Sequence, residues 1–152
     1  MPSKILIVDD NVPNVELLDA YLSGFDCEIE TAGDGMEALE KVKSFAPDLI
    51  LLDIMMPKLS GFEVCEKLKS DPKTKGIMIL MVTALSELGD VERAVNAGCD
   101  DYLSKPVNKH ELLKRVDNML KFRFVTNELE RLKRYIDEID KEETKNSVTG
   151  KA

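Results

Sequence analysis

Five short apolar runs, separated by longer amphipathic segments, constrain the fold of this 152-residue chain most. The runs occupy residues 5–8, 27–31, 49–52, 77–82 and 101–103. The runs at 5–8, 49–52 and 77–82 are unbroken, which is typical of parallel strands that are buried on both faces. Because each run is followed by a segment with helical spacing, the sequence predicts an α/β fold. We expect a doubly wound, five-stranded parallel sheet with helices on both faces.

The segments between the runs predict four helices, over residues 13–23, 34–45, 62–69 and 88–97, and a longer helix begins near residue 109. Asn11 is suited to cap the first helix, because an Asn side chain can accept a free backbone N–H there. The residues expected on the inner faces of the first two helices are Val15, Leu18, Leu22, Met36, Leu39, Val42 and Phe45.

Polar or charged side chains follow four of the five predicted strands. Asp9 and Asp10 follow the first, Asp53 the third, Thr83 the fourth, and Lys105 lies just beyond the fifth. In parallel α/β sheets, ligands bind beyond the carboxyl ends of the strands, which meet at one edge. We therefore expect these five side chains to gather in one place.

The chemistry of this set indicates a site for a divalent cation and a phosphoryl group. Three ionised carboxylates repel one another at short range, and Mg²⁺, which prefers oxygen ligands, removes that repulsion. The Asp53 carboxylate is then a candidate nucleophile, with Thr83 and Lys105 placed to bind phosphoryl oxygens. The alternative is that the Asp pair caps a helix or lies in a solvated turn, and that Lys105 is a surface cation.

Composition restricts the class of partner and the compartment. The formal net charge of −8 argues against direct binding of nucleic acid. Cys27, Cys65 and Cys99 are widely spaced and odd in number, which indicates free thiols in a reducing compartment. The single histidine, His110, is expected at the surface rather than beside a catalytic cysteine. Because no apolar run reaches ~18 residues, we expect a soluble, cytoplasmic protein without a membrane segment.

Residues 3–121 resemble the receiver domains of bacterial response regulators. The resemblance is carried by four motifs in order: ILIVDDN at 5–11, LLDIMMP at 51–57 with Gly61, VTA at 82–84 and YLSKP at 102–106. It implies a flavodoxin-like sheet with strand order 2-1-3-4-5. It also implies a receiver domain over residues 1–121, with residues 122–152 as an extension.

The resemblance implies a role for each site residue. Asp53 would be the phosphoacceptor, and Mg²⁺ would be bound by Asp9, Asp10, Asp53 and the carbonyl of Met55. The residues implied to bind the phosphoryl group or to switch on its arrival are Thr83, Ala84, Tyr102 and Lys105, and the Lys105–Pro106 peptide bond would be cis. For Tyr102, a static strand aromatic is the alternative.

The positions two residues after Asp53 and Thr83 influence acyl-phosphate hydrolysis in that family. They are Met55 and Leu85 in this chain, and both are apolar. Neither side chain can orient an attacking water, so we expect a comparatively long-lived phosphoryl group.

The C-terminal segment carries a coiled-coil pattern. Six apolar residues with 3-4-3-4-3 spacing, here called the tail stripe, are Phe122, Val125, Leu129, Leu132, Ile136 and Ile139. We expect Glu128 and Lys133 to attract across a parallel dimer and Glu130 to pair with Arg134 within the helix. The alternatives are a stripe packed on its own domain and a frayed end.

Residues 122–130 resemble the linkers that follow receivers in regulators with enzymatic outputs, such as diguanylate cyclases. After Ile139 the composition predicts disorder. A stand-alone regulator and a fragment of a longer one are both compatible with this sequence.

The sequence is therefore interpreted as a non-enzymatic receiver of a two-component phosphorelay. Its partners would be a sensor histidine kinase or phosphotransfer protein and a downstream effector, with a homodimer through the C-terminal helix. One alternative is an aspartyl-phosphate-forming phosphatase of the haloacid-dehalogenase type. That class has Asp-x-Asp after its first strand, where this chain has Asp9-Asp10-Asn11. The other alternative is a dimeric adaptor that is not phosphorylated.

Overall fold

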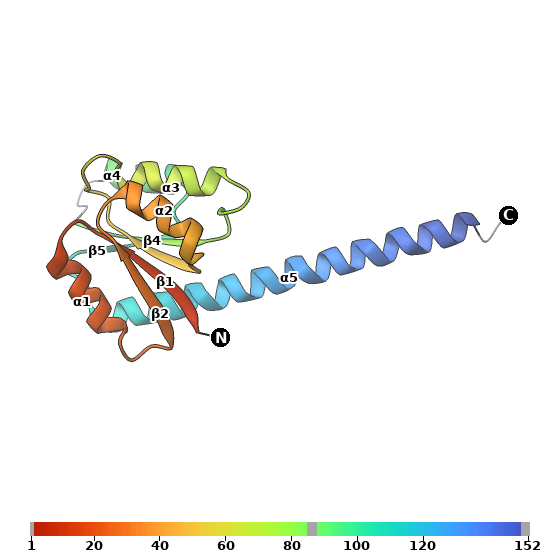
Figure 1. The fold of residues 1–152 in the computed structure, drawn as a ribbon, viewed down its shortest axis with the longest axis horizontal. Helices are drawn as coiled ribbons and strands as arrows, with labels where there is room; N and C mark the ends of the chain where they lie inside the picture. Colours follow the sequence, from red (N-terminus) through yellow and green to blue (C-terminus); the bar gives the residue numbers. More distant parts are fainter. Residues whose placement is uncertain (1, 85–87, 150–152) are drawn as a thin grey trace. The chain divides into compact units, whose positions relative to one another are not determined.

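The computed structural model describes the backbone of residues 2–84 and 88–149, with the side chains of residues 2–84 and 90–141 (Figure 1). Strands and helices alternate along the chain, as the sequence predicted. The elements are β1 (Ser3–Val8), α1 (Val12–Leu22), β2 (Cys27–Ala32), α2 (Gly35–Phe45), β3 (Leu49–Leu52), α3 (Gly61–Ser70), β4 (Met78–Thr83), α4 (Leu88–Ala97), β5 (Asp101–Ser104) and α5 (Lys109–Thr149).

The five strands form one parallel sheet in the order β2-β1-β3-β4-β5, which confirms the predicted fold class and strand order. The three central strands are the most apolar, and β3 and β4 are buried along their whole length. The edge strands β2 and β5 are only partly buried. A continuous apolar run therefore marks a central position in this sheet.

Helices cover both faces of the sheet, and each face has its own apolar core. Alternate residues of β1 point to opposite sides, with Leu6 in one core and Ile7 in the other. The core containing Leu6 is completed by side chains of α2, α3 and α4. The core containing Ile7 is completed by α1 and the first turns of α5, through Leu18, Leu112 and Val116.

Polar side chains cap the N-termini of α1, α2, α3 and α5. The side chain of Asn11 accepts the backbone N–H of Asn14 at 3.1 Å, so the predicted cap of α1 is confirmed. Asp34 caps α2 and Ser60 caps α3 in the same way. Each cap satisfies a backbone donor that has no partner inside the helix. The caps of α1 and α2 fix the residues at which these helices begin, just after the carboxyl ends of β1 and β2.

The expected inner face of α2 was partly wrong, because the Met36 side chain is 53% exposed. Its inner face is formed by Ala38, Val42 and Phe45, all buried. A repeated spacing of three residues drifts around a helix of 3.6 residues per turn. By Phe45 that drift amounts to half a turn, which places Met36 on the solvent side.

The helix α5 continues to Thr149, past Ile139, where the composition predicted a loss of order. From residue 107 to residue 149 the chain has neither glycine nor proline, and the Glu and Lys residues there are good helix formers. In this helix Arg131 pairs with Glu128 rather than the expected Arg134 with Glu130.

The chain divides into two compact units, residues up to Leu120 and residues from Lys121. Within the described residues, no helix is both long and apolar enough to cross a membrane.

Candidate functional site

The backbone of three neighbouring strands places two carboxylates side by side. Val8, the last residue of β1, pairs with Leu52, the last residue of β3. The backbone N–H of Asp53 donates to the Val8 carbonyl at 2.9 Å, and that of Asp9 donates to the Ala32 carbonyl at 3.1 Å. Both aspartates therefore leave the sheet at the same level, on its carboxyl edge.

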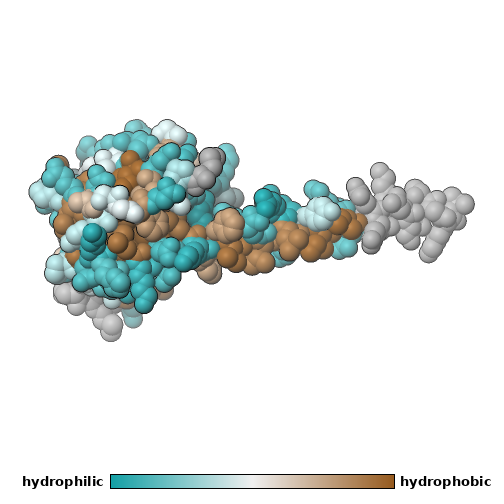
Figure 2. Space-filling model, turned by 90° about the horizontal axis from the view of Figure 1, so that it is seen from below, coloured by the Kyte–Doolittle hydropathy of each residue, from teal (hydrophilic) through white to brown (hydrophobic). Residues whose placement is uncertain are grey.

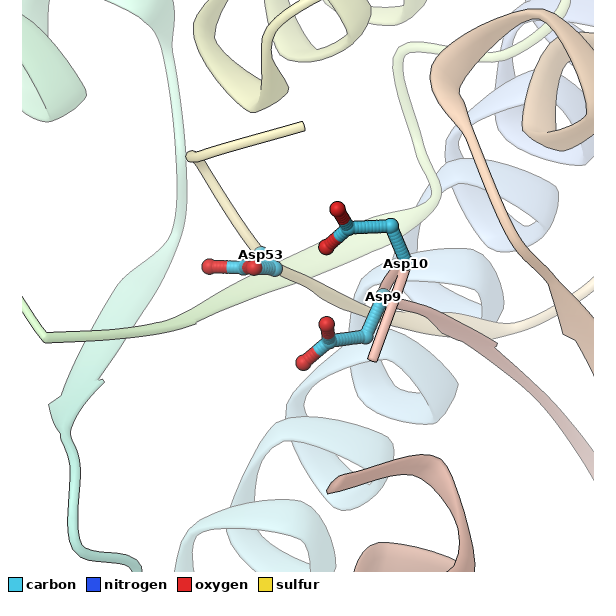
Figure 3. A group of neighbouring side chains, drawn as sticks. All are labelled: Asp9, Asp10 and Asp53. Atoms are coloured by element: carbon cyan, nitrogen blue, oxygen red, sulfur yellow. The ribbon is translucent and has the colours of Figure 1, made fainter. Parts of the chain in front are cut away.

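Asp9, Asp10 and Asp53 form a three-carboxylate cluster at the ends of β1 and β3 (Figure 3). One carboxylate oxygen from each residue lies within 4.8 Å of the other two. Asp9 and Asp53 are 4% and 6% exposed, whereas Asp10 is exposed to solvent. Two buried carboxylates and one open carboxylate suit a hard divalent cation that keeps some of its waters, as Mg²⁺ does.

Lys105, which directly follows β5, joins this cluster at the same edge of the sheet. Its Nζ lies 3.1 Å from Asp9 Oδ2 and 3.8 Å from Asp53 Oδ2. The backbone N–H of Lys105 donates to the Thr83 carbonyl at 2.8 Å, which continues the β4–β5 pairing beyond the strands. The Lys105–Pro106 peptide bond is cis, as the receiver resemblance implies. One ammonium therefore lies beside two of the three carboxylates.

Burial raises the pKa of the Asp53 carboxyl above its ordinary value, and the nearby charge of Asp9 raises it further. Lys105 and the backbone N–H groups of Ile54 and Met55 oppose this shift by stabilising the ionised form. The net effect is that the ionised form of Asp53 is disfavoured, first by burial and then by the charge of Asp9. A divalent cation beside these carboxylates would favour the ionised form.

The hydroxyl of Thr83 is buried and has no hydrogen-bond partner. Thr83 itself is 0% exposed, so water does not satisfy the hydroxyl. An unsatisfied buried hydroxyl is unfavourable and is seldom retained without a reason. Its position at the end of β4 leaves it free to bond to a group that enters the site.

The remaining predicted site residues lie near this edge, but their roles stay predictions. Ala84 is exposed just after Thr83, and Tyr102 is half-buried against the core that includes α2, α3 and α4. The Met55 side chain is 73% exposed. Leu85 lies outside the described residues.

Gly61 supports the site by a close approach that the sequence reasoning did not explain. A Cβ at this position would lie 2.3 Å from the Asp53 carbonyl oxygen and 2.8 Å from the Ile54 Cα. The Gly61 N–H donates to the Ile54 carbonyl at 3.0 Å, which folds the start of α3 back over the end of β3. Only glycine fits, because any side chain would push this backbone away from Asp53.

Asn11 also orients the site, through its backbone. Its N–H donates to Asp9 Oδ1 at 2.9 Å, while Asp9 Oδ2 faces Lys105. An Asp side chain that accepts the N–H two residues later is a common turn, so the Asp9-Asp10-Asn11 sequence held a signal for this bond. Both oxygens of the Asp9 carboxylate are thus held in place.

The other reactive side chains lie elsewhere. His110 is exposed, as expected. Cys27, Cys65 and Cys99 are free thiols, and burial raises the pKa of each above its ordinary value. A protonated thiol is a weak nucleophile, which argues against cysteine chemistry.

Comparison with known proteins agrees with this geometry. Residues 5–117 match the family model of the response regulator receiver domain. "Response regulator PleD" of Caulobacter vibrioides is 43% identical over 129 residues, which are 85% of this chain and 28% of PleD. The "DNA-binding response regulator MtrA" of Mycobacterium tuberculosis is 40% identical over 116 residues, 76% of this chain and 50% of MtrA. The chain therefore spans half or less of the length of these curated relatives.

The similarity extends to solved structures. The receiver domain of the sensor histidine kinase PA1611 from Pseudomonas aeruginosa PAO1 is 27% identical, with a TM-score of 0.73. The match covers 80% of this chain and 99% of that one. In that structure a magnesium ion is coordinated in the active site cleft.

Proposed function

Because this chain belongs to the family of response regulator receiver domains, we propose that Asp53 accepts a phosphoryl group within a two-component system. The donor would be a histidine kinase or a phosphotransfer protein. One observation carries the proposal: the Asp53 carboxylate is 6% exposed, lies beside Asp9 and Asp10, and has the Lys105 ammonium at 3.8 Å. That arrangement combines a nucleophile, a cation site and a phosphate-binding ammonium.

In the proposed reaction, an oxygen of Asp53 forms a bond to phosphorus while the bond from phosphorus to the donor nitrogen breaks. The imidazole leaves with the electron pair and takes a proton from solvent. The backbone N–H groups of Ile54 and Met55 orient the attacking carboxylate. Lys105, held by Asp9 at 3.1 Å, is within reach of the incoming phosphoryl oxygens.

The residues that would hold Mg²⁺ are Asp9, Asp10 and Asp53, together with the Met55 carbonyl. When bound, the ion would neutralise carboxylate and phosphoryl charge at the reacting centre. The carboxylate cluster and the raised pKa of Asp53 fit this role, because a nearby cation would stabilise the ionised carboxylates.

The Thr83 hydroxyl is proposed to bond to a phosphoryl oxygen once Asp53 is modified. It is buried and unpartnered, so such a bond would satisfy a group that is unsatisfied in the unmodified protein. The backbone of Ala84 would take part in the same binding, and Tyr102 would change position with Thr83. The result would be a changed surface for a downstream effector.

In this role the chain transmits a signal and does not catalyse the turnover of a substrate. Receiver domains are generally non-enzymatic, and Asp9-Asp10-Asn11 departs from the Asp-x-Asp of haloacid-dehalogenase phosphatases. The free thiols support a cytoplasmic location. The net charge of −8 supports contact with protein rather than with nucleic acid.

Intact-mass measurement after incubation with Mg²⁺ and phosphoramidate tests the proposal. We expect one added phosphoryl group in the natural chain and none in Asp53→Asn. Asp19→Asn is the matched control, because Asp19 is an exposed carboxylate on α1. Phosphorylation of Asp53→Asn at the natural level would contradict the proposal. Sustained hydrolysis of phosphate esters by the natural chain would instead favour the phosphatase.

A further inference from the structure

Among the described residues, the longest series of exposed large hydrophobic side chains lies on α5, in the second unit. The exposed large hydrophobic residues between residues 122 and 136 are Phe122, Phe124, Val125, Leu129, Leu132, Tyr135 and Ile136, each between 48% and 66% exposed. Figure 2 shows a band of hydrophobic surface along this helix. Single exposed apolar side chains are ordinary, but a contiguous band indicates a binding surface.

The band follows the geometry of a coiled-coil seam. The tail stripe keeps its 3-4-3-4-3 spacing on an uninterrupted helix, so its six residues lie along one face. In heptad notation Phe122, Leu129 and Ile136 occupy position a. A helix that packed on a flat surface would have no need for a repeat of 3.5 residues.

The charges beside the seam favour a second copy in parallel. Glu128 is at position g and Lys133 at the following position e, so each would face its opposite charge in a parallel partner. The other flanking positions, Lys121 with Thr126 and Tyr135 with Asp140, bring no like charges together. The seam is thus complementary to itself in register.

We propose that residues 122–139 pair with the same residues of a second copy as a parallel, two-stranded coiled coil. Phe124 and Tyr135 extend the apolar face on the side of Glu128 and cover one edge of the seam. The pairing requires no phosphoryl group and does not depend on the function proposed for Asp53. Its failure would therefore leave that function untouched.

Sedimentation equilibrium of the unphosphorylated full chain tests the pairing. We expect the mass to rise with concentration from the 17.1 kDa of one chain to twice that value. Leu129→Glu places two carboxylates in the seam and should weaken the dimer at least ~100-fold. Asn127→Glu is the matched control, since it adds the same charge on the opposite side of the helix and should leave the mass unchanged.

Orientation is tested by oxidising Leu129→Cys with diamide. In a parallel pair in register, each new thiol faces its copy, so a covalent dimer should form rapidly. Asn127→Cys faces solvent and should crosslink slowly. The natural chain, with its three thiols, sets the background.

The charge pair gives a second readout of register. Glu128→Lys and Lys133→Glu should each weaken the dimer about 5-fold, and the double variant should restore it. If the natural chain is monomeric at ~100 µM, and remains so after 100-fold dilution of that sample, the proposal is overturned. Equal crosslinking of Leu129→Cys and Asn127→Cys would also overturn it.

Discussion

The two units of this chain use apolar side chains in opposite ways. In residues 2–120 they fill two cores, and most residues of the three central strands are less than 2% exposed. Along residues 122–136 the large apolar side chains of α5 are about half exposed or more. The first unit can derive its stability from its own packing, whereas the second leaves large apolar side chains exposed. One helix, α5, contributes to both.

The strongest test of this contrast uses the same substitution twice on α5. Leu112 is fully buried in the first unit, and Leu129 is 60% exposed in the second. Leu112→Ala should lower the free energy of unfolding by about 3 kcal/mol, because it leaves a cavity. Leu129→Ala should change it by less than ~0.5 kcal/mol in dilute, monomeric protein.

Urea unfolding followed by circular dichroism at low micromolar concentration measures both values. Equal losses in the two variants would mean that the stripe is part of the domain core, and the contrast between the units would not hold.

Gly61→Ala tests the packing that positions the site. The added methyl group meets the Asp53 carbonyl oxygen, which Gly61 approaches too closely for any Cβ. We expect a loss of roughly 2 kcal/mol in the free energy of unfolding, together with reduced phosphorylation. Gly24→Ala is the control, since nothing lies within 4 Å of its added methyl group. If Gly61→Ala and Gly24→Ala have the same free energy of unfolding, the backbone around Asp53 can shift to accommodate the added methyl group.

Thr83→Val separates stability from function within the first unit. It replaces an unsatisfied buried hydroxyl by a methyl group of similar shape. The free energy of unfolding should rise by about 1 kcal/mol, while the response to phosphorylation at the effector surface should be lost. Thermal unfolding measures the first effect, and the change in backbone amide chemical shifts on phosphorylation measures the second. A less stable Thr83→Val would imply that the hydroxyl has a partner in solution.

Asp53→Asn should stabilise the protein in buffer without divalent cations. The folded-state pKa of Asp53 is above its ordinary value of 3.8, so the folded state binds a proton more tightly than the unfolded state. Stability from this group is greatest below pH 3.8 and falls as the pH rises through the folded-state value.

The melting temperature of Asp53→Asn should therefore exceed that of the natural chain at pH 7 in EDTA. The difference should shrink at pH 4 and on addition of Mg²⁺. A difference that is unaffected by both pH and Mg²⁺ would rule out charge repulsion as its cause.

The prediction with the smallest effect concerns the reactivity of one thiol in each unit. Burial raises the pKa of the Cys65 thiol to about 12, so almost no thiolate is present at pH 8. Cys65 should react with an aromatic disulfide reagent only on unfolding, whereas a thiol introduced by Asn127→Cys should react at once. Peptide mapping after brief labelling distinguishes the two positions. Prompt labelling of Cys65 in folded protein would show that the core of the first unit opens readily.

Much of the site was predictable because the carboxyl ends of parallel strands converge. Asp9, Asp10, Asp53 and Lys105 each followed an apolar run, and the structure brings them together. The inner face of α2 was harder, since helical spacing alone did not show that Met36 lies on the solvent side. Periodicity shows that a helix has an apolar face, but packing against the sheet decides which residues lie on the buried side.

The sequence by itself determined the alternation of strands and helices, the polar residues at the strand ends and the repeat of the tail stripe. These properties are local, because they follow from the spacing of side chains along one segment. Only the tertiary structure decided that Lys105 lies closer to Asp9 than to Asp53, and that Thr83 has no partner. It also placed Gly61 against the Asp53 carbonyl. Asp9 and Lys105 are 96 residues apart in sequence, and their distance is set by how the strands pair and how the loops pack above them. No local spacing encodes that distance.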